Sequence, residues 1–429
     1  MNKYNNHLII ARNTSQMLLI DKLLRENDIV TDMVPTPPET GTVCAIAIKI
    51  SEISLNKAKA IILNNHLNIK NICQEKKYKL QGLLDKKLES LVSKNFTRIL
   101  KKIENGEDLE KEELIYLLQT KKQKEIETIF FMADKIRAKM VGEHIEIRAA
   151  IEFSNYCQKS CNYCGINSKC TGVKRYRMNE NEIITEVKKI KKLGIKTVIL
   201  QSGEDPLWPT ERIAKLTKHI KQQTNMNITL SVGERTKQEY KLLKQEGGDN
   251  YLLKIETTNQ DIFKQIHPDD DFEYRLKCSK WLKEVGFLSG SGNIIGLPGQ
   301  TLEDIANDII YFKNMGIHMI GIGPFIPAKE TEYQELPHGD IDLTLRTIAV
   351  TRIHCKKVFL PSTTALASLD KEAQVWALKS GANTIMLIST PDKYKENYQI
   401  YNDKNMVDLD SAIYAAKKSG RLIPKYLKL

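Results

Sequence analysis

The sequence has no long hydrophobic run and few cysteines, and both absences narrow the class of protein. No stretch approaches the length of about 18 consecutive apolar residues that a membrane-spanning helix requires. The N-terminus lacks the small-residue cleavage site of a secretory signal peptide. The eight cysteines among 429 residues are too few and too irregularly spaced for a disulfide scaffold. Together these absences predict a soluble, cytoplasmic protein without a membrane partner.

Hydrophobic content and charge exclude two further classes. A hydrophobic fraction of 41% suffices for a sizeable core, which excludes wholesale disorder. The formal net charge of +12 would suit nucleic-acid binding, but the lysines lie among apolar residues at helical spacing rather than in clusters with aromatics. Such lysines are typical of solvated helix faces, so we expect no nucleic-acid partner.

The pattern over residues 1–78 is typical of a small α+β domain. Short β-rich runs alternate with two segments whose apolar residues recur at helical spacing. The expected order is strand, helix, strand, strand, helix, strand, which fits a ferredoxin-like fold. We expect its strands over residues 8–11, 29–34, 43–50 and 70–74. Residues 79–140, rich in Lys and Glu and then in helical apolar stripes, are expected to form a helical connector.

From residue 141 onward a unit of helix, glycine and short β-rich run repeats along the chain. Glycine just past a helix supplies the left-handed residue that ends it. Short buried strands alternating with helices predict a parallel sheet built from βαβ units. We therefore expect a TIM-type (βα)8 barrel over residues 141–404 and a helical tail over 405–429. The eight expected strands cover residues 145–153, 197–200, 227–230, 251–253, 287–288, 318–321, 358–360 and 384–387.

Polar runs rich in Gly and Pro follow the expected strands. In a (βα)8 barrel, the C-terminal ends of the strands form the mouth that carries the catalytic residues. Each run alone is typical of a turn, but eight in register predict a functional site at this mouth. The runs cover residues 154–164, 201–206, 231–235, 256–258, 296–301, 323–327, 362–364 and 389–391.

Three cysteines follow the first of these strands with the spacing C-x3-C-x2-C. Cys157, Cys161 and Cys164 could each bind one iron of a cubane cluster, since thiolates are the ligands that iron–sulfur clusters prefer. Three protein ligands leave the fourth iron open for catalysis. The alternative is a structural zinc site with Cys170 as fourth ligand. Zinc sites usually pair C-x2-C with a second such pair or with histidines, and neither is present here.

This cysteine loop, with Tyr163 before its last cysteine, resembles that of the radical S-adenosylmethionine (SAM) superfamily. The resemblance implies two cofactors, a 4Fe–4S cluster and SAM. It implies that the amino and carboxylate groups of SAM chelate the open iron. An electron from the cluster would then cleave SAM to methionine and a 5′-deoxyadenosyl radical, while the protein positions the cofactors and excludes water.

Further runs narrow the resemblance to the HydE family, the radical SAM maturases of FeFe-hydrogenase. This family is related to biotin synthase and to the mutase of the pyrrolysine pathway. The resemblance extends over about residues 94–404. The runs that carry it cover residues 199–205, 228–235, 295–301, 319–327 and 361–366.

The resemblance implies cofactor roles for residues at the mouth, besides the three cluster cysteines. Tyr163 would pack near the adenine, and Gly203 and Glu204 would meet the SAM amino group. Glu256 would accept a hydrogen bond from the ribose or amino group. Arg275 would pair with the SAM carboxylate, a task that suits a guanidinium fork. Further SAM-side candidates are Gln201, Thr229 and Ser231.

The chain departs from the family pattern where the substrate is expected. Asn250 and Lys254 stand where the family has arginines, and residues 386–388 are apolar where it usually has Met-Pro-Asn. The auxiliary cysteine trio that some members carry is missing. We expect Lys254, Thr363 and Thr364 to bind a substrate that bears a carboxylate or thiolate. The alternative places Lys254 at the barrel rim and lets the threonines bond the backbone.

The sequence therefore predicts a radical SAM enzyme for H-cluster assembly in FeFe-hydrogenase, acting on a small molecule that could be an iron complex. Expected partners are companion maturases and an electron donor such as ferredoxin or flavodoxin. One alternative is a paralogue acting on another small sulfur- or amino-acid-derived substrate. An alternative of another class is a non-catalytic iron–sulfur scaffold, which would not need the SAM-side residues.

Residues 33–48 resemble a small family described as a selenium or sulfur carrier. The resemblance would make Cys44 a persulfide carrier, which requires an exposed and activated thiolate. The family usually has glycine after this cysteine, whereas Ala45 stands here. The alternative is a buried strand cysteine, which the flanking Val43 and Ala45 favour.

Overall fold

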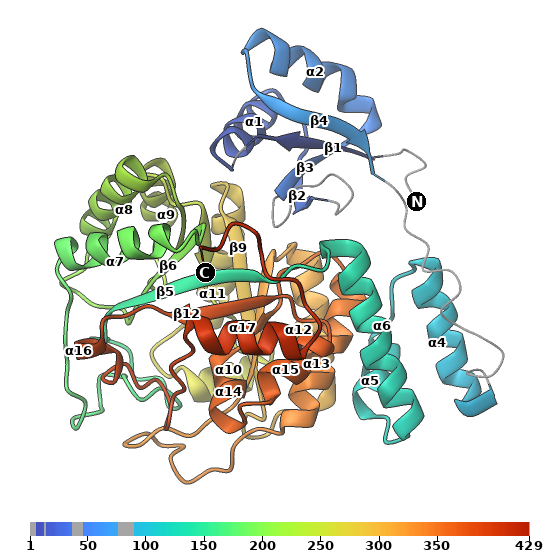
Figure 1. The fold of residues 1–429 in the computed structure, drawn as a ribbon. Helices are drawn as coiled ribbons and strands as arrows, with labels where there is room; N and C mark the ends of the chain where they lie inside the picture. The colour runs from blue at the N-terminus through green and yellow to red at the C-terminus, as the bar shows by residue number, and fades with distance from the viewer. Residues whose placement is uncertain (1–5, 13, 37–45, 76–89, 429) are drawn as a thin grey trace.

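The computed structural model describes residues 6–12, 14–36, 46–75 and 90–428 (Figure 1). Within these residues, a small N-terminal domain is followed by three helices and by an eight-stranded parallel barrel. Among the described helices, none combines the length and the apolar character needed to cross a membrane.

The N-terminal domain is an antiparallel sheet covered by two helices, which confirms the predicted α+β fold. Its elements are β1 (Asn6–Ala11), α1 (Thr14–Glu26), β2 (Asp32–Pro35), β3 (Ile46–Ser51), α2 (Leu55–Asn64) and β4 (Ile69–Gln74). The strand order β2-β3-β1-β4 is that of a ferredoxin-like sheet. The core forms because alternate strand residues, such as Ile9 and Ile48, face the apolar stripe of α1, including Ile20 and Leu24.

Three helices lead into the barrel: α4 (Lys94–Asn105), α5 (Lys111–Gln119) and α6 (Gln123–Val141). The hydroxyl of Ser93 caps the start of α4, and Gly106 ends that helix in the left-handed conformation. The apolar stripe predicted on α6 packs against a later barrel helix, α13 (Ile341–Cys355). The three helices therefore share the hydrophobic core of the barrel.

Eight parallel strands form a nearly closed barrel, as predicted. They are β5 (Glu146–Ser154), β6 (Thr197–Ser202), β7 (Asn227–Ser231), β8 (Asn250–Leu252), β9 (Leu288–Ile295), β10 (Met319–Pro324), β11 (Pro361–Ser362) and β12 (Thr384–Ile388). The strands β5 to β10 pair in chain order, β11 pairs with β12, and β12 pairs with β5. Between β10 and β11 the ring closes through a single parallel bridge from Met319 to Phe359. The expected seventh strand, 358–360, is thus displaced to 361–362, because its first residues contact β10 before pairing with β12 begins.

Helices surround the barrel on its outer side. They are α7 (Glu180–Lys192), α8 (Thr210–Thr224), α9 (Lys237–Gln245), α10 (Gln260–Ile266), α11 (Phe272–Glu284), α12 (Leu302–Met315), α13, α14 (Thr364–Leu369), α15 (Ala373–Lys379), α16 (Asp392–Lys395) and α17 (Leu409–Lys418). The helix α17, in the expected tail, buries its alanines against α15 and β12. The predicted domain boundaries at residues 78, 140 and 404 stay a prediction.

The N-terminal domain contacts the barrel at the N-terminal ends of the strands, opposite the mouth. The imidazole of His318, just before β10, lies 3.0 Å from the carbonyl oxygen of Met33. Lys357, shortly before β11, forms a 2.6 Å ion pair with Glu75. Leu288, the first residue of β9, belongs to the hydrophobic core of the small domain. The described residues of that domain therefore contact the end of the barrel opposite the mouth.

Candidate active site

A cavity of about 370 Å³ opens at the C-terminal ends of the barrel strands, and we call it the mouth cavity. All of the sequence-predicted site residues line it except Thr229. The lining residues among them are Cys157, Cys161, Tyr163, Cys164, Gln201, Gly203, Glu204, Ser231, Lys254, Glu256, Arg275, Thr363 and Thr364. The topology thus brings together residues that are spread over more than 200 positions.

The cysteine loop after β5 is held in shape by one half-buried arginine, Arg175. Arg175 donates to the backbone carbonyl oxygens of Asn155, Ile166, Asn167 and Cys170, at 2.5 to 3.0 Å. A guanidinium with several donors in a fixed plane suits this role, because each donor can bond a different carbonyl of an irregular loop. The loop is therefore ordered by its own contacts.

The three cysteines are free thiols that share the mouth cavity. Burial, with the charge of Cys157 next, raises the pKa of Cys164 to about 12. Burial and the charges of Cys164 and Asp270 raise the pKa of Cys161 well above its ordinary value. Thiols in this state require a bound metal to become thiolates.

The donor set fits a cluster better than a single zinc ion. Among the described residues, the three cysteine sulfurs do not form a group within 4.8 Å, as ligands of one ion would. Cys170 is buried, faces three backbone carbonyl oxygens at 3.7 to 3.9 Å and does not line the mouth cavity. The residues present therefore fit a cluster with three thiolates and an open iron.

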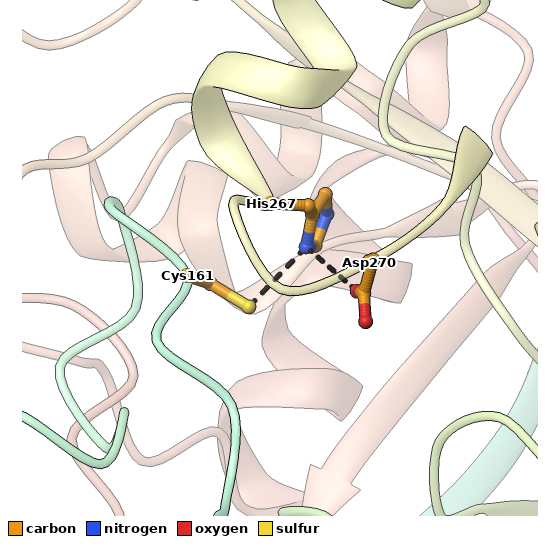
Figure 2. Close-up of side chains that lie close together, drawn as sticks. All are labelled: Cys161, His267 and Asp270. Carbon is orange, nitrogen blue, oxygen red and sulfur yellow. Dashed lines mark hydrogen bonds and ion pairs between the residues drawn. The ribbon is translucent and has the colours of Figure 1, made fainter.

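Cys161 lies beside a histidine and an aspartate from the turn between α10 and α11. Figure 2 shows the three side chains pointing toward one another. His267 Nδ1 is 3.2 Å from Cys161 Sγ and 3.3 Å from an oxygen of Asp270. Burial lowers the pKa of His267. Burial alone would raise the pKa of Asp270, but the hydrogen bond from His267, the charge of Arg275 and the hydrogen bond from Lys159 hold it well below its ordinary value.

Arg275 projects from α11 into this network, and its guanidinium is fully engaged. Nε donates to Glu234 at 2.5 Å, and the two terminal nitrogens donate to the carbonyl oxygen of Lys254 at 2.7 Å and to Asp270 at 2.8 Å. Burial works against the charged form, but Glu234 and Asp270 raise the pKa of Arg275. A SAM carboxylate would have to share this fork with two acidic side chains, so its pairing with Arg275 stays a prediction.

Glu256 connects the SAM side of the mouth cavity with the expected substrate side. It accepts a 3.4 Å hydrogen bond from the Tyr163 hydroxyl and forms a 2.7 Å ion pair with Lys254. Its backbone adopts a left-handed φ of 61° beside β9, a conformation that is unusual for a residue with a side chain and that is found at functional sites. Lys254 is therefore paired, rather than a free cation facing the cavity.

The loop after β6 packs directly against the cysteine loop, and this requires glycine at position 203. A Cβ atom there would lie 2.3 Å from the carbonyl oxygen of Tyr156 and 2.7 Å from the Cβ of Cys157. The next side chain, Glu204, accepts a hydrogen bond from the backbone N–H of Glu234 at 2.9 Å. The carboxylate of Glu204 is thus oriented at the cavity wall, which the three cysteines also line.

The two threonines predicted on the substrate side line the cavity, and both have partners. The Thr363 hydroxyl donates to the carbonyl oxygen of Ile322 at 3.3 Å, and the Thr364 hydroxyl lies 2.8 Å from that of Tyr401. The hydrogen bond from Thr363 is long and therefore weak. Its hydroxyl can turn toward a ligand more readily than that of Thr364.

Thr229 lies outside the lining of the mouth cavity, and its expected role toward SAM stays a prediction. It accepts a 3.0 Å hydrogen bond from Asn250 and lines a small separate pocket toward the other end of the barrel. Thr229 and Ser231 are two positions apart on β7, so both point inward, but Thr229 lies about 6.6 Å deeper along the strand. Sequence alternation identifies the face of a strand and not the depth of a residue in the barrel.

The structure adds residues that sequence reasoning missed. Glu152 and Lys404 form an ion pair on the cavity wall, and Tyr398 and Tyr401 line the same wall. A glutamate inside the buried β5 was a signal for the pair, but nothing marked Lys404. His267 and Asp270 also line the cavity; their place directly before the helix of Arg275 could have signalled them.

Comparison with known proteins decides the family. Residues 151–311 match the model of the Radical SAM superfamily. The chain is 42% identical over 278 residues, 65% of this chain and 80% of the other, to the [FeFe] hydrogenase maturase subunit HydE of Thermotoga maritima. The chain belongs to the HydE family of radical SAM enzymes. Membership implies a 4Fe–4S cluster and SAM as cofactors. Residues 6–74 match the Se/S carrier protein-like family, as the sequence predicted.

More distant relatives share the barrel with this HydE family member. The 3-methylornithine synthase of Methanosarcina acetivorans is 25% identical over 333 residues, which cover 77% of this chain and 94% of that protein. The crystal structure of methylornithine synthase (PylB) aligns with a TM-score of 0.69 at 22% identity, covering 76% of this chain and 97% of that one. This likeness shows the common fold. Cys44, the candidate carrier cysteine, lies outside the described residues, so both of its interpretations stay predictions.

Proposed function

We propose that this chain is a maturase that takes part in assembling the H-cluster of FeFe-hydrogenase. One observation carries the proposal. Three thiols and all of the SAM-side residues except Thr229 line a single cavity in a chain that is 42% identical to a protein named as such a maturase. In this proposal Cys157, Cys161 and Cys164 hold the cluster. The cytoplasmic location predicted from the sequence is part of the proposal.

The residues of the mouth cavity divide into a SAM side and a substrate side. When bound, the cluster and SAM together supply a 5′-deoxyadenosyl radical. Gly203 lets the β6 loop approach the cysteine loop, so that Glu204 can orient the SAM amino group. Tyr163 and Glu256 would contact the nucleoside of SAM, and the hydrogen bond between them orients both side chains. When SAM is bound, this side of the cavity would exclude water, which a reactive radical requires.

The substrate side supports a small anionic substrate. Lys254, Thr363 and Thr364 supply one cation and two hydroxyls to the inner wall. A carboxylate or thiolate could replace Glu256 as the partner of Lys254 and accept from the hydroxyls. The proposal includes companion maturases and a ferredoxin- or flavodoxin-type electron donor as partners.

A second candidate function is that of a paralogue with another small sulfur- or amino-acid-derived substrate. It is favoured by the pairing of Lys254 with Glu256 and by the apolar Met386 and Ile388 in the cavity lining. Both features reduce the positive charge available to an anionic iron complex. The third possibility, a scaffold that only carries iron–sulfur clusters, does not use the SAM-side residues.

Anaerobic reconstitution with iron and sulfide, followed by a SAM cleavage assay, tests the proposal. The wild-type chain should bind four irons and form 5′-deoxyadenosine only with reductant. Cys161→Ala should lose the cluster and cleavage, whereas the matched control Cys170→Ala should keep both. A cluster without cleavage would indicate a scaffold. Complementation of a hydrogenase strain that lacks its own HydE separates the maturase from the paralogue, which would cleave SAM but fail to complement.

A further inference from the structure

We propose that His267 donates a hydrogen bond from Nδ1 to the iron-bound thiolate of Cys161 and thereby raises the reduction potential of the cluster. The inference rests on the proposed function only in that Cys161 is taken to be a cluster ligand. It assigns to His267 the role of a positioning and tuning residue, which acts on the cofactor through a protein thiolate.

The geometry holds His267 against Cys161 from several directions. The ring is buried, stacks edge-on against Tyr163 at 5.5 Å between centroids and packs on Phe263 at 4.8 Å. In Figure 2 its Nδ1 edge points between the sulfur of Cys161 and the carboxylate of Asp270. A ring clamped in this way cannot turn its Nδ1 edge away without disturbing the packing around it.

The cysteine loop is also bonded to the turn that carries His267. Asn162 donates its backbone N–H to the carbonyl oxygen of Ile266 at 3.0 Å and its side-chain amide to that of Gln265 at 2.7 Å. The backbone N–H of Ser160 donates to Asp269 at 2.6 Å. These three bonds flank Cys161 on both sides. They fix the distance between its sulfur and the imidazole.

The position of the proton on His267 follows from its partners. An iron-bound thiolate and a carboxylate can only accept hydrogen bonds, so the nitrogen between Cys161 and Asp270 must carry the hydrogen. The other nitrogen, Nε2, is buried and has no hydrogen-bond partner within the part of the chain that the structure describes. An unpartnered acceptor is tolerated better than an unpartnered buried N–H, which again places the hydrogen on Nδ1.

The same three side chains could suggest a site for a single metal ion, since their ligand atoms lie within 4.8 Å of one another. The charges around Asp270 argue against it. Asp270 already accepts from Arg275 at 2.8 Å and from Lys159 at 2.5 Å. Two cationic side chains on one carboxylate repel a further cation. The group is therefore a shared hydrogen bond, in which the single Nδ1–H of His267 lies between the sulfur of Cys161 at 3.2 Å and the carboxylate of Asp270 at 3.3 Å.

A hydrogen bond to a thiolate ligand draws negative charge away from the sulfur. It stabilises the reduced cluster, which carries one more electron, and so makes the potential less negative. Because Asp270 is compensated by Arg275 and Lys159, its charge does not cancel this effect. His267 would thus help to set how readily the cluster accepts an electron from the electron-donor protein.

The test compares two substitutions in the reconstituted full-length protein. His267→Phe keeps an aromatic ring but removes the donor, whereas His267→Asn can place an amide N–H where Nδ1 lies. Redox titration followed by electron paramagnetic resonance measures the potential, and iron analysis measures cluster content. We expect the Phe variant to accept the electron about tenfold less favourably than wild type, a shift of about −59 mV for one electron. The Asn variant should stay close to wild type.

Each outcome decides the inference separately from the proposed function. An unchanged potential in a Phe variant that holds four irons would overturn the role of His267, while the cluster assignment would stand. Loss of iron from the Phe variant alone supports the N–H···S bond. Loss of iron from both variants contradicts the inference, because the imidazole itself would then be needed. A wild-type chain that binds no cluster would instead refute the proposed function.

Discussion

Lys404 and Glu152 form an ion pair on the wall of the mouth cavity, although 252 positions separate them in the chain. Both side chains are 2% exposed. The ammonium of Lys404 also donates to the carbonyl oxygen of Tyr398 at 3.2 Å, and Thr390 donates to Glu152 at 3.2 Å. The pair connects β5, the first barrel strand, with the segment that follows β12, the last one. It therefore links the two ends of the barrel sequence on one wall of the cavity.

The first prediction follows from this burial. Lys404→Met should lower the free energy of unfolding by about 3–5 kcal/mol, because it leaves the carboxylate of Glu152 buried without a counter-charge. Urea unfolding at neutral pH measures the change. The double variant Glu152→Gln with Lys404→Met should recover much of the loss, since it removes both charges. Equal destabilisation in the single and double variants would contradict the explanation.

The second prediction concerns Arg275. Arg275→Lys should weaken SAM binding by roughly 1.5–3 kcal/mol, because an ammonium cannot bond Glu234, Asp270 and a cofactor carboxylate at once. Equilibrium binding of SAM to the reconstituted protein measures it, with iron content expected to stay normal. Arg212→Lys is the matched control, because Arg212 pairs with Glu180 outside the mouth cavity. Unchanged affinity in Arg275→Lys would remove Arg275 from the SAM site.

Much of the barrel could be predicted because its signals are local. Gly194, Gly286, Gly316 and Gly381 all adopt the left-handed conformation after a helix, as the repeated helix–glycine–strand unit indicated. The cysteine loop was equally predictable, since its three cysteines lie within eight positions. The seventh strand was displaced by three residues because its pairing is decided by two neighbours, β10 and β12, and not by its own sequence.

The rest of the site depends on contacts that no local pattern encodes. Lys404 gave no sign of its pairing with Glu152, and the closed network around Arg275 depends on the packing of α11 against the loops after β7 and β8. The depth of Thr229 in the barrel is likewise set by strand register. The sequence therefore indicated which residues line the mouth cavity, but not which of their charged side chains form ion pairs with one another.

The third prediction is that the free energy of unfolding depends on pH through Asp308, which lies on α12. Burial raises the pKa of Asp308 to about 7 from an ordinary 3.8, although Asn293 and Thr258 donate to it. The native state thus holds a proton that the unfolded chain releases. The contribution of Asp308 to the free energy of unfolding is therefore fully present below about pH 4. It is lost as the pH rises through 7, by up to roughly 1.4 kcal/mol per pH unit. Urea unfolding at pH 5 and pH 8 measures it. Asp308→Asn, which resembles the protonated side chain, should flatten the dependence; an unchanged slope would contradict the assignment.

The last prediction addresses the substrate wall. Thr363 and Thr364 line the cavity; the Thr363 hydroxyl donates a 3.3 Å bond to a carbonyl oxygen, and the Thr364 hydroxyl contacts that of Tyr401. The double change Thr363→Val and Thr364→Val keeps the side-chain shape and removes both donors. In a strain that depends on this gene for hydrogenase activity, it should abolish maturation, while the purified variant still cleaves SAM without substrate turnover. Thr351→Val is the control, because that hydroxyl is buried in α13 away from the cavity. Normal maturation by the double variant would show that the two hydroxyls do not bind the substrate.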